Sequence, residues 1–265
     1  MVLPCHFGEW LQGRLGASGP VALVTLVPRG IGMRARRQSG VLAPCWFGTG
    51  AGRLPLPVLR RFLADLGQPA TGRFELRPRF VPGSGTGMST SALLAVAALA
   101  GYRGSPAVLA RACLAAEGAS DPLMYAAPDQ LLWASRLGRI LGHLPPPPRA
   151  QLLAGFWGPP ERTRSADDDY DDISDLVAGW AAGPDLAVCA ALASESARRC
   201  QERRGPSADP TATLARELGA LGWARSHSGP ARVLIFSPGA LPTSAAAALR
   251  SAGLRGIQIL ATGHH

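Results

Sequence analysis

A glycine-rich loop followed by three hydroxyl side chains stands out at residues 81–92. The segment reads Val-Pro-Gly-Ser-Gly-Thr-Gly-Met-Ser-Thr-Ser-Ala. Glycines let the backbone adopt positive φ and approach a ligand closely, and the first N–H groups of a following helix point toward an anion. Hydroxyl groups in the first helical turn can contact phosphate oxygens or Mg²⁺. Residues 82–91, which we call the cradle, therefore predict a phosphate site, although a flexible turn before a buried helix has a similar composition.

The composition limits which phosphate chemistry the cradle can support. The chain contains no lysine and no asparagine. A P-loop needs a lysine beside its serine or threonine, and the protein kinases need a strand lysine and a catalytic-loop asparagine. Both classes are therefore excluded. A cradle without lysine has to rely on backbone N–H groups, the helix dipole, a metal ion and arginine.

The distribution of the charged residues along the chain argues against a nucleic-acid partner. The formal net charge is +9, which would suit such a partner. The arginines are scattered, however, with short clusters at 34–37 and 198–204 and no aromatic ladder between them. An acidic run at 167–172 lacks the spacing of a calcium loop, and we interpret it as a solvated loop rather than a cation site.

The length and the pattern of prolines suggest two lobes. A chain of 265 residues that is 47% hydrophobic can bury one large core or two modest ones. Four consecutive prolines at 145–148 favour an extended spacer, so we expect lobes at residues 1–144 and 149–265. The apolar run at 92–100 is too short to span a bilayer, and no signal-like stretch follows Met1. We therefore expect a soluble, cytoplasmic protein.

Hydrophobic periodicity and capping residues predict alternating strands and helices. In the first lobe we expect strands at 21–27 and 74–77 and helices at 56–66, 92–100 and 106–117. In the second we expect strands at 150–157, 232–236 and 256–261 and helices at 173–180, 186–204, 211–221 and 243–251. This order indicates an α+β fold.

Three segments, in this order, resemble the three sequence motifs of the GHMP kinases. They are residues 4–13 (Pro-Cys-His-Phe-Gly-Glu-Trp-Leu-Gln-Gly), the cradle, and residues 226–229 (Ser-His-Ser-Gly). Within that superfamily the forms of the first and third motifs and the stretch 117–125, followed by Leu144 and its prolines, look most like the L-threonine kinases of cobalamin synthesis and propanediol utilisation. The resemblance covers nearly the whole chain.

The resemblance implies a two-lobed GHMP kinase fold, with an N-terminal lobe like ribosomal protein S5 domain 2, a ferredoxin-like C-terminal lobe, and ATP and Mg²⁺ between them. It assigns the nucleotide to the cradle residues Pro82, Gly83, Ser84, Gly85, Thr86, Gly87, Met88, Ser89, Thr90 and Ser91. Ser91 takes the role of a metal ligand and catalytic residue, and Thr90 contacts phosphate. Glu117 takes the second metal position, although it could equally be a solvated residue at a helix end.

The resemblance also suggests how an acceptor is held. Asp121 is the candidate base or substrate-positioning residue, and it could equally cap a turn ahead of Pro122. Glu9 and Gln12 would face the acceptor, with Glu9 paired to an ammonium group, unless both are only strand residues on an exposed face. His227, Ser228 and Gly229 of the third motif would line the same cleft.

The function that the resemblance implies is transfer of the γ-phosphoryl group of ATP to L-threonine, giving O-phospho-L-threonine for the cobalamin nucleotide loop. Homoserine or another hydroxylated metabolite is the alternative acceptor. The cradle has one residue more between Pro82 and Gly85 than the family spacing, and Ser89-Thr90 replaces its usual Gly-Ser pair. A catalytically silent nucleotide-binding regulator therefore also stays open, as do an RNA-binding module and a homodimer.

Overall fold

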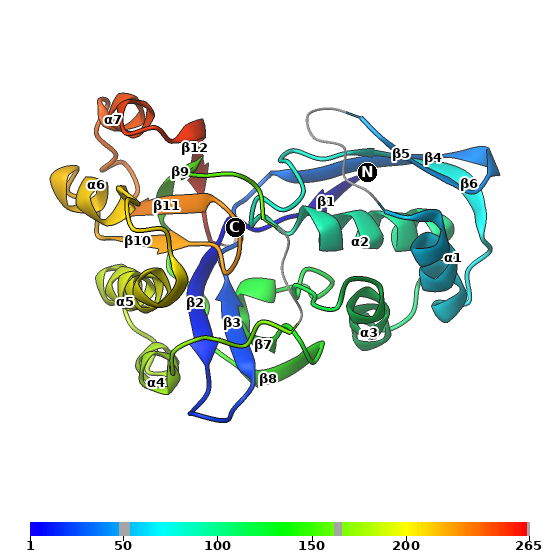
Figure 1. Cartoon of the computed structure of the whole chain (residues 1–265), viewed down its shortest axis with the longest axis horizontal. Coiled ribbons are helices and arrows are strands. Elements are labelled where there is room, and N and C mark those ends of the chain that lie inside the picture. Colours follow the sequence, from blue (N-terminus) through cyan, green and yellow to red (C-terminus); the bar gives the residue numbers. More distant parts are fainter. Residues whose placement is uncertain (48–53, 162–165, 264–265) are drawn as a thin grey trace.

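Two β-sheets organise the chain (Figure 1). The computed structural model describes residues 1–47, 54–161 and 166–263. Within these residues a four-stranded sheet has the order β1-β4-β6-β5, and an eight-stranded sheet has the order β12-β9-β11-β10-β2-β3-β7-β8. All neighbouring strands run antiparallel except β5 and β6.

The four-stranded sheet is built from the first third of the chain and supports the cradle helix. Its strands are β1 (Val2–Pro4), β4 (Gly32–Val41), β5 (Ala43–Trp46) and β6 (Thr71–Arg77). The helices of this region are α1 (Leu56–Asp65), α2 (Met88–Ala100) and α3 (Pro106–Glu117). Helix α2 contacts both the sheet and α3 (Figure 1). It is apolar almost all round, as expected of a helix enclosed on several sides.

The eight-stranded sheet combines strands from both halves of the chain. Its first half contributes β2 (Glu9–Arg14), β3 (Val21–Thr25), β7 (Leu131–Ala134) and β8 (Arg139–His143), with a 3-10 turn at Pro128–Gln130 before β7. Its second half contributes β9 (Gln151–Phe156), β10 (Gly222–Arg225), β11 (Ala231–Phe236) and β12 (Arg255–Ala261). The helices α4 (Ser174–Ala181), α5 (Leu186–Arg204), α6 (Thr211–Glu217) and α7 (Ala245–Ser251) pack against this sheet.

The two halves of this sheet meet at a single pair of residues. Glu9 of β2 pairs with Arg225 of β10, and Glu9 also pairs with Thr25 of β3. The first sequence motif therefore lies where β2, β3 and β10 meet.

The prolines at 145–148 lie in the connection from β8 to β9. The division of the chain into two lobes at these prolines stays a prediction.

Most helices lie where the sequence predicts them. The bounds of α3 and α5 agree with the prediction, and the Ser105 hydroxyl caps α3 by accepting from Val108 N at 3.3 Å. Helix α2 begins at Met88, four residues before the predicted start, so the hydroxyls of Ser89, Thr90 and Ser91 belong to its first turn. Helix α6 ends at Glu217 rather than at residue 221.

Helix α6 ends early because Gly219 adopts φ +66° and Ala220 N donates back to Ala215 O at 2.9 Å, as in a Schellman motif. Gly222, which the sequence predicts as the cap of this helix, begins β10, and a Cβ atom at Gly222 would lie 2.3 Å from the carbonyl oxygen of Ala190 in α5. The glycine is thus needed where a strand and a helix approach closely, a requirement that local helix signals do not reveal.

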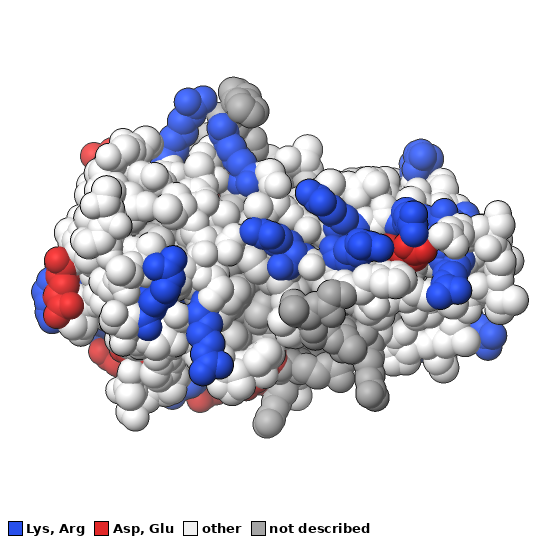
Figure 2. Space-filling model, turned by 90° about the horizontal axis from the view of Figure 1, so that it is seen from above, with Lys and Arg blue, Asp and Glu red and all other residues white. Residues whose placement is uncertain are grey.

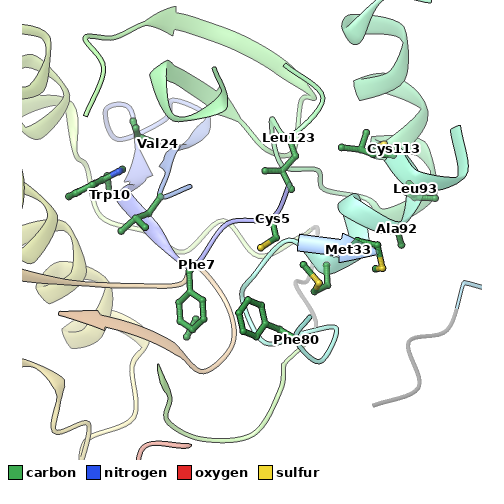
Figure 3. Packing of buried hydrophobic residues seen from close by; sticks show 14 of the residues in the cluster. Cys5, Phe7, Trp10, Val24, Met33, Phe80, Ala92, Leu93, Cys113 and Leu123 are labelled. Carbon is green, nitrogen blue, oxygen red and sulfur yellow. The ribbon is translucent and has the colours of Figure 1, made fainter. Parts of the chain in front are cut away.

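An aromatic cluster fixes the start of the chain beneath the cradle. The rings of Phe7 and Phe80 lie 5.2 Å apart, edge to face (Figure 3). The ring of Phe156 lies 5.0 Å from that of Phe7. Such pairs contribute beyond the area that they bury. Because Phe7 stands between His6 and Gly8, this packing holds both residues against the cradle.

The acidic run and the arginines of α5 neutralise each other. Arg203 lies 2.6 Å from Asp169 and 2.7 Å from Asp171, and Arg204 pairs with Asp167. Asp167, Asp168, Asp169 and Asp171 therefore belong to a salt-bridged loop, and no cluster of metal-ligating side chains occurs in the described part of the chain. On the face seen in Figure 2, several basic side chains gather around an acidic one at the right, and the others stand apart among uncharged residues.

The described helices include none that has both the length and the hydropathy to span a bilayer.

Candidate active site

A cavity of about 450 Å³ lies where the three sequence motifs meet. The first motif contributes His6 and Glu9, and the third contributes Ser226, His227 and Ser228. The cradle contributes Pro82, Gly83, Gly85, Thr86, Gly87, Met88, Ser89 and Thr90. Glu117, Asp121 and Glu161 add further carboxyl groups to the wall. The predicted site residues that do not line the cavity are Gln12, Ser84, Ser91 and Gly229.

Three of these residues, Gln12, Ser84 and Gly229, support the cavity wall through contacts with neighbouring segments. The Gln12 side chain donates to the carbonyl of Arg225 at 2.9 Å, which ties β2 to β10. The hydroxyls of Ser84 and Thr86 bond each other at 2.9 Å within the cradle. Gly229 packs on the cradle backbone, where a Cβ atom would lie 2.6 Å from the oxygen of Gly83.

Backbone hydrogen bonds clamp the cradle between the first and third motifs. His6 N donates to Thr86 O at 3.2 Å, and Gly8 N donates to Gly85 O at 3.2 Å. On the other side, Ala231 N donates to Ser84 O at 3.1 Å. The carbonyl groups of Ser84, Gly85 and Thr86 therefore fix the loop, and Ser84 N is itself bonded to Val81 O at 3.1 Å.

Two cradle glycines are required by space as well as by conformation. Gly85 has φ +77°, and a Cβ atom there would lie 2.2 Å from Cβ of Ser226. Gly87 has φ +64°, and a Cβ atom there would lie 2.4 Å from Cδ2 of His6. Positive φ strains any residue with a side chain, and here no room for a side chain exists.

The three consecutive hydroxyls at the start of α2 do not all have the same partner. Ser89 Oγ donates to Glu117 Oε1, and Thr90 Oγ1 donates to Glu117 Oε2 at 3.1 Å. Ser91 Oγ instead donates to the carbonyl of Pro4 at 2.5 Å, and Ser91 is fully buried. A carboxylate with two hydroxyls is an oxygen-only set that suits a hard cation such as Mg²⁺. The structure brings Ser89 and Thr90, but not Ser91, to Glu117.

A buried ionisable cluster lies beside this carboxylate. His6 Nε2 lies 3.3 Å from Asp121 Oδ2, and His6 Nδ1 lies 3.6 Å from Glu9 Oε1. Thr90 connects the cluster to the cradle, because its hydroxyl also accepts from Asp121 N at 3.4 Å. The side chain of Glu9 is only 2% exposed, so Glu9 is not a residue of an exposed strand face.

Burial, and the attraction between His6 and the two carboxyl groups, together set the protonation states in this cluster. Burial raises the pKa of Glu9 to about 8, although His6 opposes the change. Burial alone would lower the pKa of His6, but the charges of Asp121 and Glu9 outweigh it and raise that pKa to about 9. Burial would likewise raise the pKa of Asp121, but the charge and hydrogen bond of His6 lower it. At neutral pH the cluster thus holds an Asp121 carboxylate, a His6 imidazolium and an uncharged Glu9.

His227 is held by stacking rather than by hydrogen bonds. Its ring lies parallel to that of Tyr170, with centroids 4.2 Å apart. Both ring nitrogens of His227 are buried without a hydrogen-bond partner among the described residues. Burial lowers the pKa of His227 well below its usual value, and Arg136, Arg204 and Arg225 add to the effect. His227 is therefore a neutral imidazole that can both donate and accept a hydrogen bond.

Comparisons with known proteins place the fold. The structure matches the mevalonate kinase of L. major, solved with R-mevalonate, with a TM-score of 0.64 and 14% identity over 98% of this chain and 94% of that chain. It matches the homoserine kinase of Cytophaga hutchinsonii with a TM-score of 0.59 and 17% identity over 98% and 94%. It matches the mevalonate pyrophosphate decarboxylase of Streptococcus pyogenes with a TM-score of 0.58 and 10% identity over 100% and 98%. The chain has the GHMP kinase fold.

The predicted fold class is thereby confirmed as a mixed α+β GHMP kinase fold that spans the whole chain. No protein-family model and no curated protein matches the sequence. Identities of 10–17% show the fold alone, and the reaction has to be argued from the site.

Three ionisable residues that line the cavity, His6, Arg136 and Glu161, are absent from the sequence prediction. His6 stands inside the first motif, and its polar side chain between Cys5 and Phe7 is a signal that could have found it. Arg136 lines the cavity as well, but it follows β7 in a turn outside all three motifs. Only the folded chain brings Arg136 to Asp121 and His227.

We expect the pH dependence of stability to report the buried Glu9. Between its usual pKa of 4.5 and about 8, folded Glu9 keeps a proton that the unfolded chain has released, and His6 does the same between 6.5 and about 9. Stability therefore falls as the pH rises from 6.5 to 9. The melting temperature should drop by several degrees, since 1 kcal/mol shifts it by about 2–4 °C for chains of roughly this size.

Calorimetry of the wild-type protein and of Glu9→Gln across this pH range checks the expectation. The variant carries no titrating group at this position, so its melting temperature should fall less steeply. Equal slopes for the two proteins would contradict the assignment of Glu9.

Proposed function

We propose that this protein is an ATP-dependent kinase that transfers the γ-phosphoryl group to a hydroxyl group of a small metabolite. The observation that carries the proposal is the contact of Glu117 with the Ser89 and Thr90 hydroxyls at the start of α2, beside the Asp121 carboxylate. The fold does not decide the reaction, because kinases and a decarboxylase share it.

The cradle would bind the phosphates of ATP. Helix α2 has 13 residues and no acidic residue in its first turn, so its amide groups and dipole favour an anion. Phosphoryl transfer needs positioning and charge stabilisation more than covalent help from the protein. A cradle whose carbonyl groups are already bonded offers such a fixed site.

Glu117 and the hydroxyls of Ser89 and Thr90 would hold Mg²⁺. When bound, the ion neutralises charge on the β- and γ-phosphates. The resemblance gave a ligand role to Ser91, but its hydroxyl is bonded to Pro4 behind the cavity wall. We therefore transfer the ligand role to Ser89, which is exposed.

Asp121 would orient the acceptor hydroxyl and receive its proton. Its carboxylate lines the cavity and is kept ionised by His6. A carboxylate with a lowered pKa is a weak base, but it accepts a hydrogen bond from an alcohol and directs the alcohol oxygen toward phosphorus.

The acceptor that we propose is L-threonine, which would give O-phospho-L-threonine for the cobalamin nucleotide loop. The sequence resemblance supports this choice, and so do the acidic cluster that can meet an ammonium group and the neutral His227 nearby. Glu9, His227 and Ser228 would contact the acceptor directly, whereas Gln12 and Gly229 would position the wall.

Release of ADP from Mg·ATP tests the proposal, with L-threonine, L-serine, L-homoserine and mevalonate as acceptors and Glu117→Gln as the inactive control. We expect turnover with L-threonine that the control lacks. Turnover with another acceptor alone would retain the kinase and overturn the threonine assignment. ATP binding without turnover of any acceptor would favour a silent nucleotide-binding regulator, and absence of ATP binding would refute the kinase proposal.

A further inference from the structure

One guanidinium group lines the active-site cavity among the described residues, and it belongs to Arg136. The chain has no lysine, so Arg136 is also the permanent cation of this wall as far as the structure describes it. A fixed guanidinium in the cavity wall can bind a ligand that carries a complementary negative group.

Arg136 stands on the acceptor side of the cavity. Ser120 N donates to Ser135 O at 3.0 Å, so the residues that follow, Asp121 and Arg136, are held close together. The positive charge of Arg136 contributes to the lowered pKa of both Asp121 and His227. Both of these residues belong to the region where the acceptor would bind.

The guanidinium group of Arg136 is held in place by hydrogen bonds that do not use all of its N–H donors. Nη1 donates to Ser135 Oγ at 2.8 Å, and Nη2 donates to the carbonyl of Asp167 at 3.0 Å. The group also lies 5.7 Å from the centre of the Tyr170 ring, which stacks on His227. Nε is buried and has no hydrogen-bond partner in the described part of the chain. A guanidinium has five N–H donors, so three remain for a ligand.

The acceptor region therefore contains both a fixed positive charge, on Arg136, and a negative one, on the Asp121 carboxylate. An α-amino acid carries the matching pair, a carboxylate and an ammonium group. Resting on the proposed kinase function, we propose that Arg136 binds the α-carboxylate of an amino-acid acceptor and so selects amino acids over alcohols that lack this group. The side-chain hydroxyl of the amino acid is then left to face the cradle.

The test compares L-threonine with L-threonine amide, in which the carboxylate is replaced by a neutral group. The wild-type protein should favour L-threonine by about 10-fold to 100-fold in KM, the range of a charge-assisted hydrogen bond. In Arg136→Gln this preference should collapse to within about threefold, while the KM for ATP stays unchanged. Arg136→Lys, which keeps the charge but loses the planar fork, should fall between the two and serves if the glutamine variant does not fold.

Arg204→Gln is the matched control. Arg204 also lies over Tyr170, at 4.3 Å, and also contacts Asp167, but it does not line the cavity. This variant should retain the preference for L-threonine, because it disturbs the same loop without removing the carboxylate partner. A loss of preference equal to that of Arg136→Gln would overturn the inference.

The remaining outcomes separate this inference from the kinase proposal. A raised KM for ATP, or an equal loss with both acceptors, would place Arg136 at the phosphates and overturn the inference. If no acceptor is turned over, calorimetric titration with L-threonine, L-serine and L-homoserine decides. Binding that is lost in Arg136→Gln and kept in Arg204→Gln would support the carboxylate site although the kinase proposal fails. If the wild-type protein binds none of these amino acids, the carboxylate site is refuted.

Discussion

Glu117→Gln is expected to lower kcat by at least about a hundredfold, the size of effect seen when one electrostatic contact to a developing charge is removed. The substitution keeps the shape of the side chain, but its single amide oxygen replaces the two carboxylate oxygens that accept from the Ser89 and Thr90 hydroxyls. It removes the negative charge that a divalent cation needs. Activity measured against Mg²⁺ concentration should therefore show a higher requirement for the metal as well as a lower maximum.

The variants Ser89→Ala and Ser91→Ala distinguish which of the two hydroxyls takes part in binding Mg²⁺. We expect Ser89→Ala to raise the Mg²⁺ concentration for half-maximal activity about tenfold, because it removes one oxygen from the site. Ser91→Ala should leave that concentration unchanged and lower the melting temperature, because it removes the hydrogen bond between the buried Ser91 side chain and the carbonyl of Pro4. The opposite result would return the ligand role to Ser91, as the sequence resemblance has it.

The register of these hydroxyls shows what the sequence could and could not establish. The cradle and its helix follow from local signals, namely closely spaced glycines and a run of strong helix formers. Consecutive residues of a helix point about 100° apart, however, so three adjacent hydroxyls cannot share one partner. Which of them meets Glu117 depends on how α2 is turned against β1, and that is a property of the tertiary packing.

The arrangement of the acidic cluster likewise depends on contacts between residues that are far apart in the sequence. Glu9 and Asp121 could be selected as candidates from the motifs in which they stand. That His6 lies between them, and that Glu9 is uncharged at neutral pH, follows from the junction of β2, β3 and β10 and from burial. Arg136 carries no local signal, since one arginine among many in a turn is unremarkable until the chain folds. Residues with a role in charge balance were therefore the hardest to predict.

Asp121→Asn is expected to lower kcat by about 10²-fold to 10⁴-fold, because the amide neither takes a proton nor orients the acceptor hydroxyl as a carboxylate does. The KM for ATP should change little, since the cradle backbone is held by the first and third motifs. A variant that keeps more than a tenth of the wild-type kcat would support the alternative that Asp121 only caps the turn before Pro122.

The pH profile of His6→Gln tests how Asp121 acts. In the wild-type protein His6 keeps the pKa of Asp121 below its usual 3.8, so kcat/KM should show no acid limb near neutral pH. The His6 imidazolium loses its proton at about pH 9, and activity should decline there. In His6→Gln burial of Asp121 is no longer opposed by a neighbouring positive charge on His6, so its pKa rises and the acid limb should move upward by one pH unit or more. An acid limb that stays in place would mean that the ionisation of Asp121 does not control the reaction, and the proton would then leave the acceptor through solvent or phosphate after the transfer.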